Sequence, residues 1–188
     1  MSFRDEMLET ATLAGGCFWC TEAIFARLKG VTAVIPGYTG GTTENPTYEQ
    51  VCTGSTGHAE AIKITFDPRT ISYTKLVEIF FRLHDPTTLN QQGYDIGTEY
   101  RSAIFYHSEN QKQIAETVKA QLMPIFKNKI VTEIVPYTKF YVAENYHQNY
   151  YDKNKQFPYC QYVIDPKLKK LLAQYRQEVK EEFLTKHS

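Results

Sequence analysis

Residues 58–66 alternate between two kinds of side chain, and this alternation constrains the fold more than any other segment does. One side carries Glu60, Ile62, Ile64 and Phe66, and the other carries Ala59, Ala61, Lys63 and Thr65. A period of two is typical of a β-strand whose two faces meet different surroundings. The apolar face has to be covered by other elements, and it holds a carboxyl.

Helical patterns and further strand-like segments alternate along the rest of the chain. Strands are predicted at residues 31–35, 102–107 and 129–135, with the first ending before Pro36-Gly37. Helices are predicted at residues 21–29, after the capping residues Ser72 and Ser108, and after Asp165-Pro166. Residues 84–101 have the composition of a loop.

Mixed strands and helices predict an α/β (α+β) two-layer sandwich, with helices flanking a mixed, partly antiparallel sheet. A chain of 188 residues is long enough for one domain with a full core and short for two. We therefore expect a single catalytic domain over residues 1–188, with its core at about 8–165 and a C-terminal helix at about 166–184.

Charge and hydropathy restrict the class of partner. Lys plus Arg and Asp plus Glu both total 21, so the net charge of zero argues against nucleic acid or an anionic membrane. No stretch approaches the roughly 18 apolar residues of a membrane helix, and residues 1–6 show no signal peptide. The four cysteines are expected to be thiols in a reducing compartment, the cytoplasm.

The segment Gly16-Cys17-Phe18-Trp19-Cys20 places a thiol beside two large aromatic rings, just before a predicted helix. The positive end of a helix favours thiolate over thiol, so Cys17 is a candidate nucleophile. Phe18 and Trp19 suggest a substrate whose apolar end lies against the sulfur. The alternative is that both rings are core aromatics at a helix start.

Glu60 is the second candidate, because it shares its strand face with three apolar residues. Burial raises the pKa of a carboxyl, and a carboxyl that stays protonated near neutral pH can donate a proton to an oxygen. The alternative is a glutamate at the rim of the strand, paired with Lys or Arg.

Six segments, two of which contain Cys17 and Glu60, follow one another along the chain. Together they resemble the A-type peptide-methionine sulfoxide reductases over about residues 13–166. They are Gly15-Gly16-Cys17-Phe18-Trp19-Cys20, Gly37-Tyr38-Thr39-Gly40-Gly41, Thr47-Tyr48-Glu49-Gln50-Val51-Cys52, Thr56-Gly57-His58-Ala59-Glu60, His84-Asp85-Pro86-Thr87-Thr88 and Gly97-Thr98-Glu99-Tyr100-Arg101-Ser102. Enzymes of this kind reduce methionine sulfoxide, with one enzyme for each epimer. The resemblance implies the S epimer, a ferredoxin-like core with long loops and an extended C-terminal segment.

The resemblance also implies a role for each site residue. Cys17 attacks the sulfoxide sulfur, while Glu60, Tyr48 and Tyr100 donate to the departing oxygen. Phe18, Trp19 and Asp95 complete the substrate pocket, with Asp95 orienting it by hydrogen bonds. The catalytic roles of Tyr48 and Tyr100 rest on their positions in the motifs, because most of the 14 tyrosines in the chain are expected to be structural. The residues around Asp95 are also typical of a turn, which is the alternative explanation for Asp95.

A second thiol must then condense with the sulfenic acid that forms on Cys17. The resemblance implies that this second thiol is Cys160. It also implies that thioredoxin would reduce the resulting disulfide between Cys17 and Cys160. Cys20 is the alternative, one helical turn from Cys17 but poorly aimed if the helix is regular. Cys52 is expected to pack as a small buried residue. The substrates implied are oxidised proteins and free methionine sulfoxide, and the reductant is thioredoxin or a dithiol. We expect a monomer that uses no cofactor and no metal.

Two other classes of protein remain open. Cys17 and Cys20 could be the C-x-x-C pair of a thioredoxin-like disulfide oxidoreductase, although no clear βαβ repeat surrounds them. They could also bind zinc in a non-enzymatic binding module, but no second pair with ligand spacing follows. His147 is expected to pack or to form hydrogen bonds rather than to act in catalysis.

Overall fold

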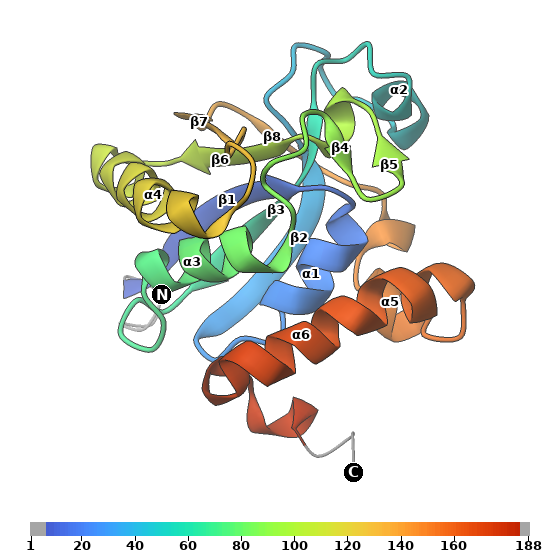
Figure 1. The fold of residues 1–188 in the computed structure, drawn as a ribbon. Coiled ribbons are helices and arrows are strands. Elements are labelled where there is room, and N and C mark those ends of the chain that lie inside the picture. The colour runs from blue at the N-terminus through green and yellow to red at the C-terminus, as the bar shows by residue number, and fades with distance from the viewer. Residues whose placement is uncertain (1–6, 185–188) are drawn as a thin grey trace.

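A computed structural model describes residues 7–184, and its main feature is a six-stranded sheet (Figure 1). The strands lie in the order β7-β6-β1-β3-β2-β8, and neighbours are antiparallel except for the parallel pair β6 and β7. Their bounds are β1 (Glu9–Gly15), β2 (Val31–Thr39), β3 (Ala59–Phe66), β6 (Ser102–Tyr106), β7 (Glu133–Pro136) and β8 (Phe140–Val142). The predicted mixed, partly antiparallel sheet is confirmed.

The centre of the sheet has a ferredoxin-like arrangement, as the resemblance implied. The elements follow as β1, α1, β2, β3, α3 and β6, and the four strands lie in the order β6-β1-β3-β2. Helices α1 (Phe18–Phe25) and α3 (Tyr73–Leu83) lie on the same side of this sheet (Figure 1). The remaining helices are α2 (Tyr48–Cys52), α4 (Glu109–Leu122), α5 (Tyr150–Lys153) and α6 (Asp165–Tyr175).

The core lies between the sheet and these helices, and the alternation of β3 decides which side chains enter it. Ile62, Ile64 and Phe66 are fully buried in the main core, with residues of α1 and α3. Ala59 and Ala61 belong to a smaller cluster that includes Ala14, Ala103 and Phe105. Glu60 shares the face of the larger core, and only 2% of it is exposed.

Strand β2 runs further than the sequence predicts, because Pro36 and Gly37 continue it instead of ending it. Pro36 pairs with Ile62, and its carbonyl accepts a hydrogen bond from the backbone N–H of Ala143 at 3.0 Å. A Cβ on Gly37 would lie 2.4 Å from the Phe140 ring, so this glycine lets β8 approach closely. Proline is tolerated here because its carbonyl, not its missing N–H, is used.

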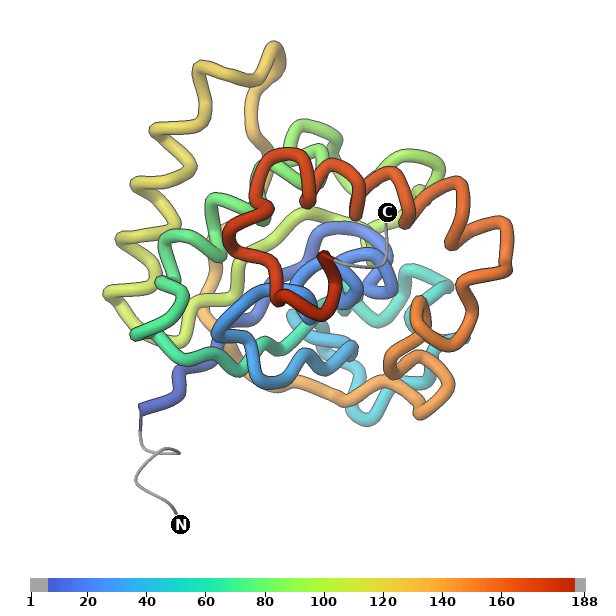
Figure 2. Tube along the Cα trace, turned by 90° about the horizontal axis from the view of Figure 1, so that it is seen from below, coloured from blue at the N-terminus to red at the C-terminus, as the bar shows by residue number. Residues whose placement is uncertain are grey.

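The C-terminal helix is shorter than expected, since α6 ends at Tyr175 and not near residue 184. Short helical turns at Arg176–Glu178 and Glu181–Phe183 follow it. The backbone N–H of Lys29 donates to the carbonyl of Glu178 at 2.7 Å, and that of Lys180 donates to the carbonyl of Arg27 at 2.9 Å. The C-terminal segment turns back towards the start of the chain (Figure 2), and these bonds with the residues that follow α1 override the helical pattern after Tyr175.

The predicted loop at residues 84–101 contains a small hairpin, β4 (Gln91–Gln92) and β5 (Asp95–Ile96), and a 3-10 turn, η2 (Thr98–Tyr100). None of the helices between residues 7 and 184 has the length and apolar character that crossing a bilayer requires. Residues 1–6, for which no signal peptide is predicted, lie outside the described part of the chain.

Candidate active site

Cys17 lies at the junction between β1 and α1, where it is the residue that caps the helix. Gly16 makes the turn with a φ of +89°, and a Cβ there would lie 2.5 Å from the side chain of Gln92. The carbonyl of Cys17 accepts from the backbone N–H of Cys20 at 3.1 Å. This glycine therefore sets the position of the thiol, which is 7% exposed.

Glu60 lies directly beside this junction. Its Oε2 accepts a hydrogen bond from the backbone N–H of Phe18 at 3.0 Å. Burial raises the pKa of Glu60 to about 8, although the hydrogen bond from Phe18 acts in the opposite direction. The carboxyl is therefore mostly protonated at neutral pH, and it meets the first N–H of the helix that Cys17 caps.

Two tyrosine hydroxyls lie close enough to Glu60 for its charge to act on them. Tyr48 is the first residue of α2, and Tyr100 ends the turn η2. Burial raises the pKa of both hydroxyls, and the negative charge of Glu60 raises it further. The structure thus brings Cys17, Glu60, Tyr48 and Tyr100 into one region, and both phenols stay protonated donors.

Trp19 and Phe18 face different parts of an aromatic cluster. The Trp19 ring stacks on Tyr150 at 3.7 Å between centroids and meets the edge of Tyr159 at 5.6 Å. Its Nε1 donates to Nδ1 of His147 at 3.0 Å. Phe18 is buried and packs against the His147 ring at 4.9 Å. The expected packing and hydrogen-bonding role of His147 is therefore confirmed.

Asp95 enters the site through Tyr159, a residue to which sequence reasoning gave no role. The Tyr159 hydroxyl donates to Oδ2 of Asp95 at 2.9 Å and lies 3.8 Å from the sulfur of Cys20. Tyr159 joins the hairpin, the C-terminal segment and the thiols. Its only signal in the sequence is its place next to Cys160, which the number of tyrosines hides.

Glu144 is a second residue that sequence reasoning missed. Its two carboxylate oxygens accept from the Tyr38 hydroxyl at 3.0 Å and from the backbone N–H of Tyr48 at 3.2 Å. A third bond, also 3.2 Å, comes from the Tyr146 hydroxyl. Glu144 therefore holds the start of α2, and with it Tyr48, against β2.

The Cys17 and Cys20 thiols act on each other's pKa, so the two side chains are neighbours. The expectation that Cys20 is poorly aimed assumed a regular helix through Cys17, but Cys17 has a ψ of 123° and stands outside the helix. Burial raises the pKa of Cys17, whereas interaction with the Cys17 thiol lowers the pKa of Cys20 to about 7. The sequence suggested that the helix end makes Cys17 a thiolate. Burial opposes this, so the helix end alone does not make Cys17 the resting thiolate.

The other two thiols also differ from expectation. Cys160 begins a π-helical turn, η5 (Cys160–Ile164), instead of lying in a loop, and it is fully buried. The charges that act on its thiol are those of Asp165 and Cys20. Cys52 is exposed and not buried. Cys17 and Cys160 both have Cys20 among the groups whose charge acts on their thiols.

The described residues, 7–184, contain no group of three or more His, Cys, Asp or Glu side chains placed to hold a metal ion. The zinc-binding alternative thus finds no ligand set around Cys17 and Cys20. The alternative of a thioredoxin-like exchanger is not supported by the sheet order, which is ferredoxin-like.

Sequence comparison finds one family across most of the chain. The family described as "Peptide methionine sulfoxide reductase" matches residues 9–180. "Peptide methionine sulfoxide reductase MsrA" of Sulfolobus acidocaldarius is 58% identical over 168 residues, or 89% of this chain and 96% of that protein. The protein of the same name from Saccharolobus solfataricus is 56% identical over 173 residues, or 92% and 98%.

Solved structures agree with the sequence comparison. Reduced Mxr1 from Saccharomyces cerevisiae is 38% identical, with a TM-score of 0.77 over 82% of this chain and 90% of that one. Mxr1 in complex with Trx2 is also similar, at 27% identity and a TM-score of 0.55 over 80% and 89%.

Proposed function

Because the chain belongs to the peptide methionine sulfoxide reductase family, we propose that it reduces the S epimer of methionine sulfoxide, free or within proteins, to methionine. The observation that carries this proposal is the meeting of Cys17 with a buried, protonated Glu60 at the start of α1. A sulfoxide needs such a pair, because its sulfur is electrophilic and its oxygen must gain protons before it can leave.

The first step is attack by Cys17 on the sulfoxide sulfur. Cys17 loses its proton as the substrate arrives, and this proton replaces the one that Glu60 gives to the sulfoxide oxygen, so that protons balance over the reaction. Phe18 and Trp19 hold the methyl group of the substrate, and Asp95 keeps Tyr159 in place beside the thiols. The polarised sulfoxide then lies between a sulfur nucleophile and the proton donors.

The second step is transfer of the oxygen. Glu60 donates its proton to the sulfoxide oxygen, and the hydroxyls of Tyr48 and Tyr100 donate hydrogen bonds to it. The attack has joined the Cys17 sulfur to the substrate sulfur, and the protonated oxygen now moves to the Cys17 sulfur. The S–O and S–S bonds of the substrate sulfur both break, which releases methionine and leaves Cys17 as a sulfenic acid. The substrate sulfur is reduced by two electrons and Cys17 is oxidised by two, so no cofactor is needed.

The sulfenic acid is then converted to a disulfide with loss of water. In this proposal Cys20, the neighbour of Cys17, condenses with the sulfenic acid, and Cys160 then takes over the disulfide. A Cys17–Cys20 disulfide forms first, and Cys160 then attacks Cys20 to give Cys20–Cys160 and a free Cys17. A direct Cys17–Cys160 disulfide is the simpler route.

Thioredoxin is the proposed reductant of that disulfide, and a small dithiol can replace it. The similarity to Mxr1 in complex with Trx2 supports this partner. A monomer that repairs oxidised proteins in the cytoplasm completes the proposal, and the four free cysteines fit such a reducing compartment.

Stereospecific turnover tests the proposed function. Each epimer of methionine sulfoxide is offered separately with a dithiol, to the wild-type protein and to Cys17→Ser. We expect methionine from the S epimer alone, and none above background from the variant. Equal reduction of both epimers, or turnover by Cys17→Ser, would contradict the proposal.

A further inference from the structure

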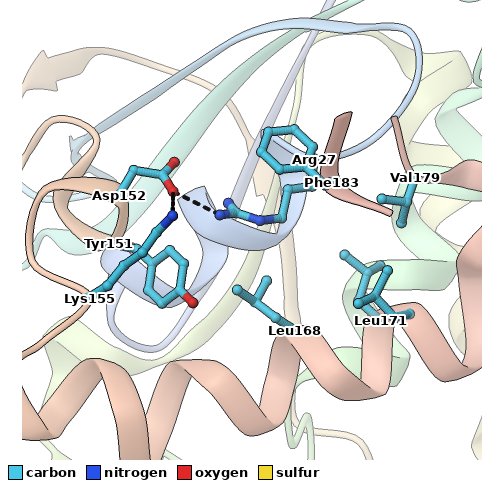
Figure 3. Close-up of a pocket in the computed structure, with 9 residues that line it drawn as sticks. Arg27, Tyr151, Asp152, Lys155, Leu168, Leu171, Val179 and Phe183 are labelled. Atoms are coloured by element: carbon cyan, nitrogen blue, oxygen red, sulfur yellow. Dashed lines mark hydrogen bonds and ion pairs between the residues drawn. The ribbon is translucent and has the colours of Figure 1, made fainter. Parts of the chain in front are cut away.

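A cavity of about 320 Å³ lies beside Arg27, which follows the C-terminal end of α1 (Figure 3). Residues of α5 and the turn after it, of α6 and of the segment that follows α6 form the rest of its lining. None of its lining residues belongs to the candidate active site. Its volume is at the lower end of the range for small-molecule sites, which are mostly apolar with a few placed polar groups.

One wall of the cavity carries three charged side chains, of which Arg27 is buried while Asp152 and Lys155 are 32% and 50% exposed. Arg27, whose side chain is only 8% exposed, lies between the rings of Tyr151 and Phe183, at 5.0 and 4.7 Å from their centroids. Its Nη2 donates to Oδ1 of Asp152 at 3.0 Å, and Nζ of Lys155 lies 3.0 Å from the same oxygen. Two cations thus share one carboxylate.

The opposite wall is apolar. Leu168, Leu171 and Leu172 come from α6, and Val179 comes from the turn after it. Leu171 and Val179 are buried, and Figure 3 shows them across the cavity from the Arg27 cluster. A ligand that fits has an apolar body for the leucines and one negative charge for the unbalanced cation.

We propose that this cavity binds an amphipathic monocarboxylate, of the chemical class of a medium-chain fatty acid. Its carboxylate pairs with Arg27 and Lys155, so that two cations face two carboxylates. Its hydrocarbon chain lies on the leucines of α6 and displaces water from them. An uncharged ligand of the same shape leaves the excess positive charge unpaired, and a cationic one is repelled.

Calorimetric titration of the full chain tests the proposal, with octanoate as the probe. Octanamide, octylamine and butyrate serve as the neutral, cationic and short-chain comparisons. We expect saturable binding of one octanoate, about tenfold or more tighter than octanamide or butyrate, and no binding of octylamine. Equal affinities for octanoate and octanamide, or no saturable binding of octanoate, would overturn the proposal.

Two variants locate the binding. Lys155→Glu reverses the excess charge at the cavity, whereas Lys169→Glu makes the same charge change on an exposed part of α6 that does not line it. We expect the first to lose octanoate binding at least tenfold and the second to keep it. Leu172→Trp, which narrows the cavity without touching the charges, should also weaken binding. Wild-type affinity in both cavity variants would place octanoate elsewhere.

Discussion

Glu60 shows how one strand position sets the chemistry of the site. The alternation of β3 places its side chain on the core face, and burial there raises its pKa to about 8. A solvated glutamate would be ionised at neutral pH and could not protonate an oxygen. The strand pattern therefore supplies an acid where the thiol needs one.

Replacing Glu60 with Gln should lower the turnover number by about 10² to 10⁴-fold, because the amide keeps the shape but carries no acidic proton. The wild-type rate should also fall as the pH rises through about 8, since Glu60 then ionises. Steady-state rates between pH 6 and 9.5 measure both effects. Glu116→Gln, on the exposed side of α4, is the control. An unchanged alkaline limb in Glu60→Gln would contradict the role of Glu60 as the acid.

The same pKa makes a separate prediction about stability. Glu60 titrates near 4.5 when unfolded and near 8 when folded, so the folded state holds the extra proton between these values. The contribution of Glu60 is fully present below pH 4.5 and is lost as the pH rises to 8. Relative to Glu60→Gln, the wild type should therefore lose about 5 kcal/mol of unfolding free energy across this interval. Urea denaturation at a series of pH values measures the difference, and parallel curves for the two proteins would refute it.

The junction between β1 and α1 depends on Gly16, which turns the chain with a positive φ and approaches Gln92. Gly16→Ala should cost about 3 kcal/mol, because the left-handed conformation and the collision with the base of the Gln92 side chain both oppose it. Gly93→Ala is the matched control, since Gly93 also has a positive φ but a Cβ there would meet nothing within 4 Å. It should cost about 1 kcal/mol. Chemical denaturation measures the unfolding free energy of both variants. Equal decreases would show that the Gln92 side chain moves aside at little cost.

The boundaries of several elements could not be predicted from local pattern. Pro36 and Gly37 are typical loop residues, yet β2 passes through them because β8 pairs there. The helical pattern of the C-terminal segment continues past Tyr175, yet α6 ends there. The residues that follow it form backbone hydrogen bonds with Arg27 and Lys29, which come after α1. Local signals worked where a cap is formed within the segment. Ser72 accepts from the N–H of Lys75, and Ser108 accepts from that of Gln111.

Candidate site residues with an unusual pattern were predictable, and common residue types were not. Cys17 follows two glycines and Glu60 interrupts an apolar strand face, so each stands out in the sequence. Tyr159 and Glu144 lie in polar, tyrosine-rich segments that have no distinctive period. Their place in the site depends on contacts between distant parts of the chain, which local pattern does not encode.

The site as a unit is assembled from segments far apart in the sequence. Phe18 meets Glu60 across 42 positions, Trp19 meets His147 across 128, and Asp95 meets Tyr159 across 64. The C-terminal segment therefore closes the site, and it also brings Cys160 towards the thiol pair on α1. Formation of the final disulfide therefore requires the start of α1 and the C-terminal segment, which are far apart in the sequence and are brought together by the fold.

Peptide mapping after one equivalent of methionine sulfoxide, without reductant, tests this arrangement. If the oxidation passes from Cys17 through Cys20 to Cys160, the wild type should end with a Cys20–Cys160 disulfide and a free Cys17. Cys160→Ser should stop at Cys17–Cys20, because the two thiols are already neighbours in the reduced structure. Cys20→Ser should accumulate a sulfenic acid on Cys17 that dimedone traps, since Cys160 lacks its neighbour.

Cys52→Ser is the control for that experiment, because the exposed Cys52 thiol has no place in the proposed relay. It should give the same disulfide as the wild type. A Cys17–Cys160 disulfide that forms in Cys20→Ser as fast as resolution does in the wild type would show that Cys160 reaches the sulfenic acid directly. The buried η5 turn would then have to open during turnover, because Cys160 is fully enclosed in the reduced structure.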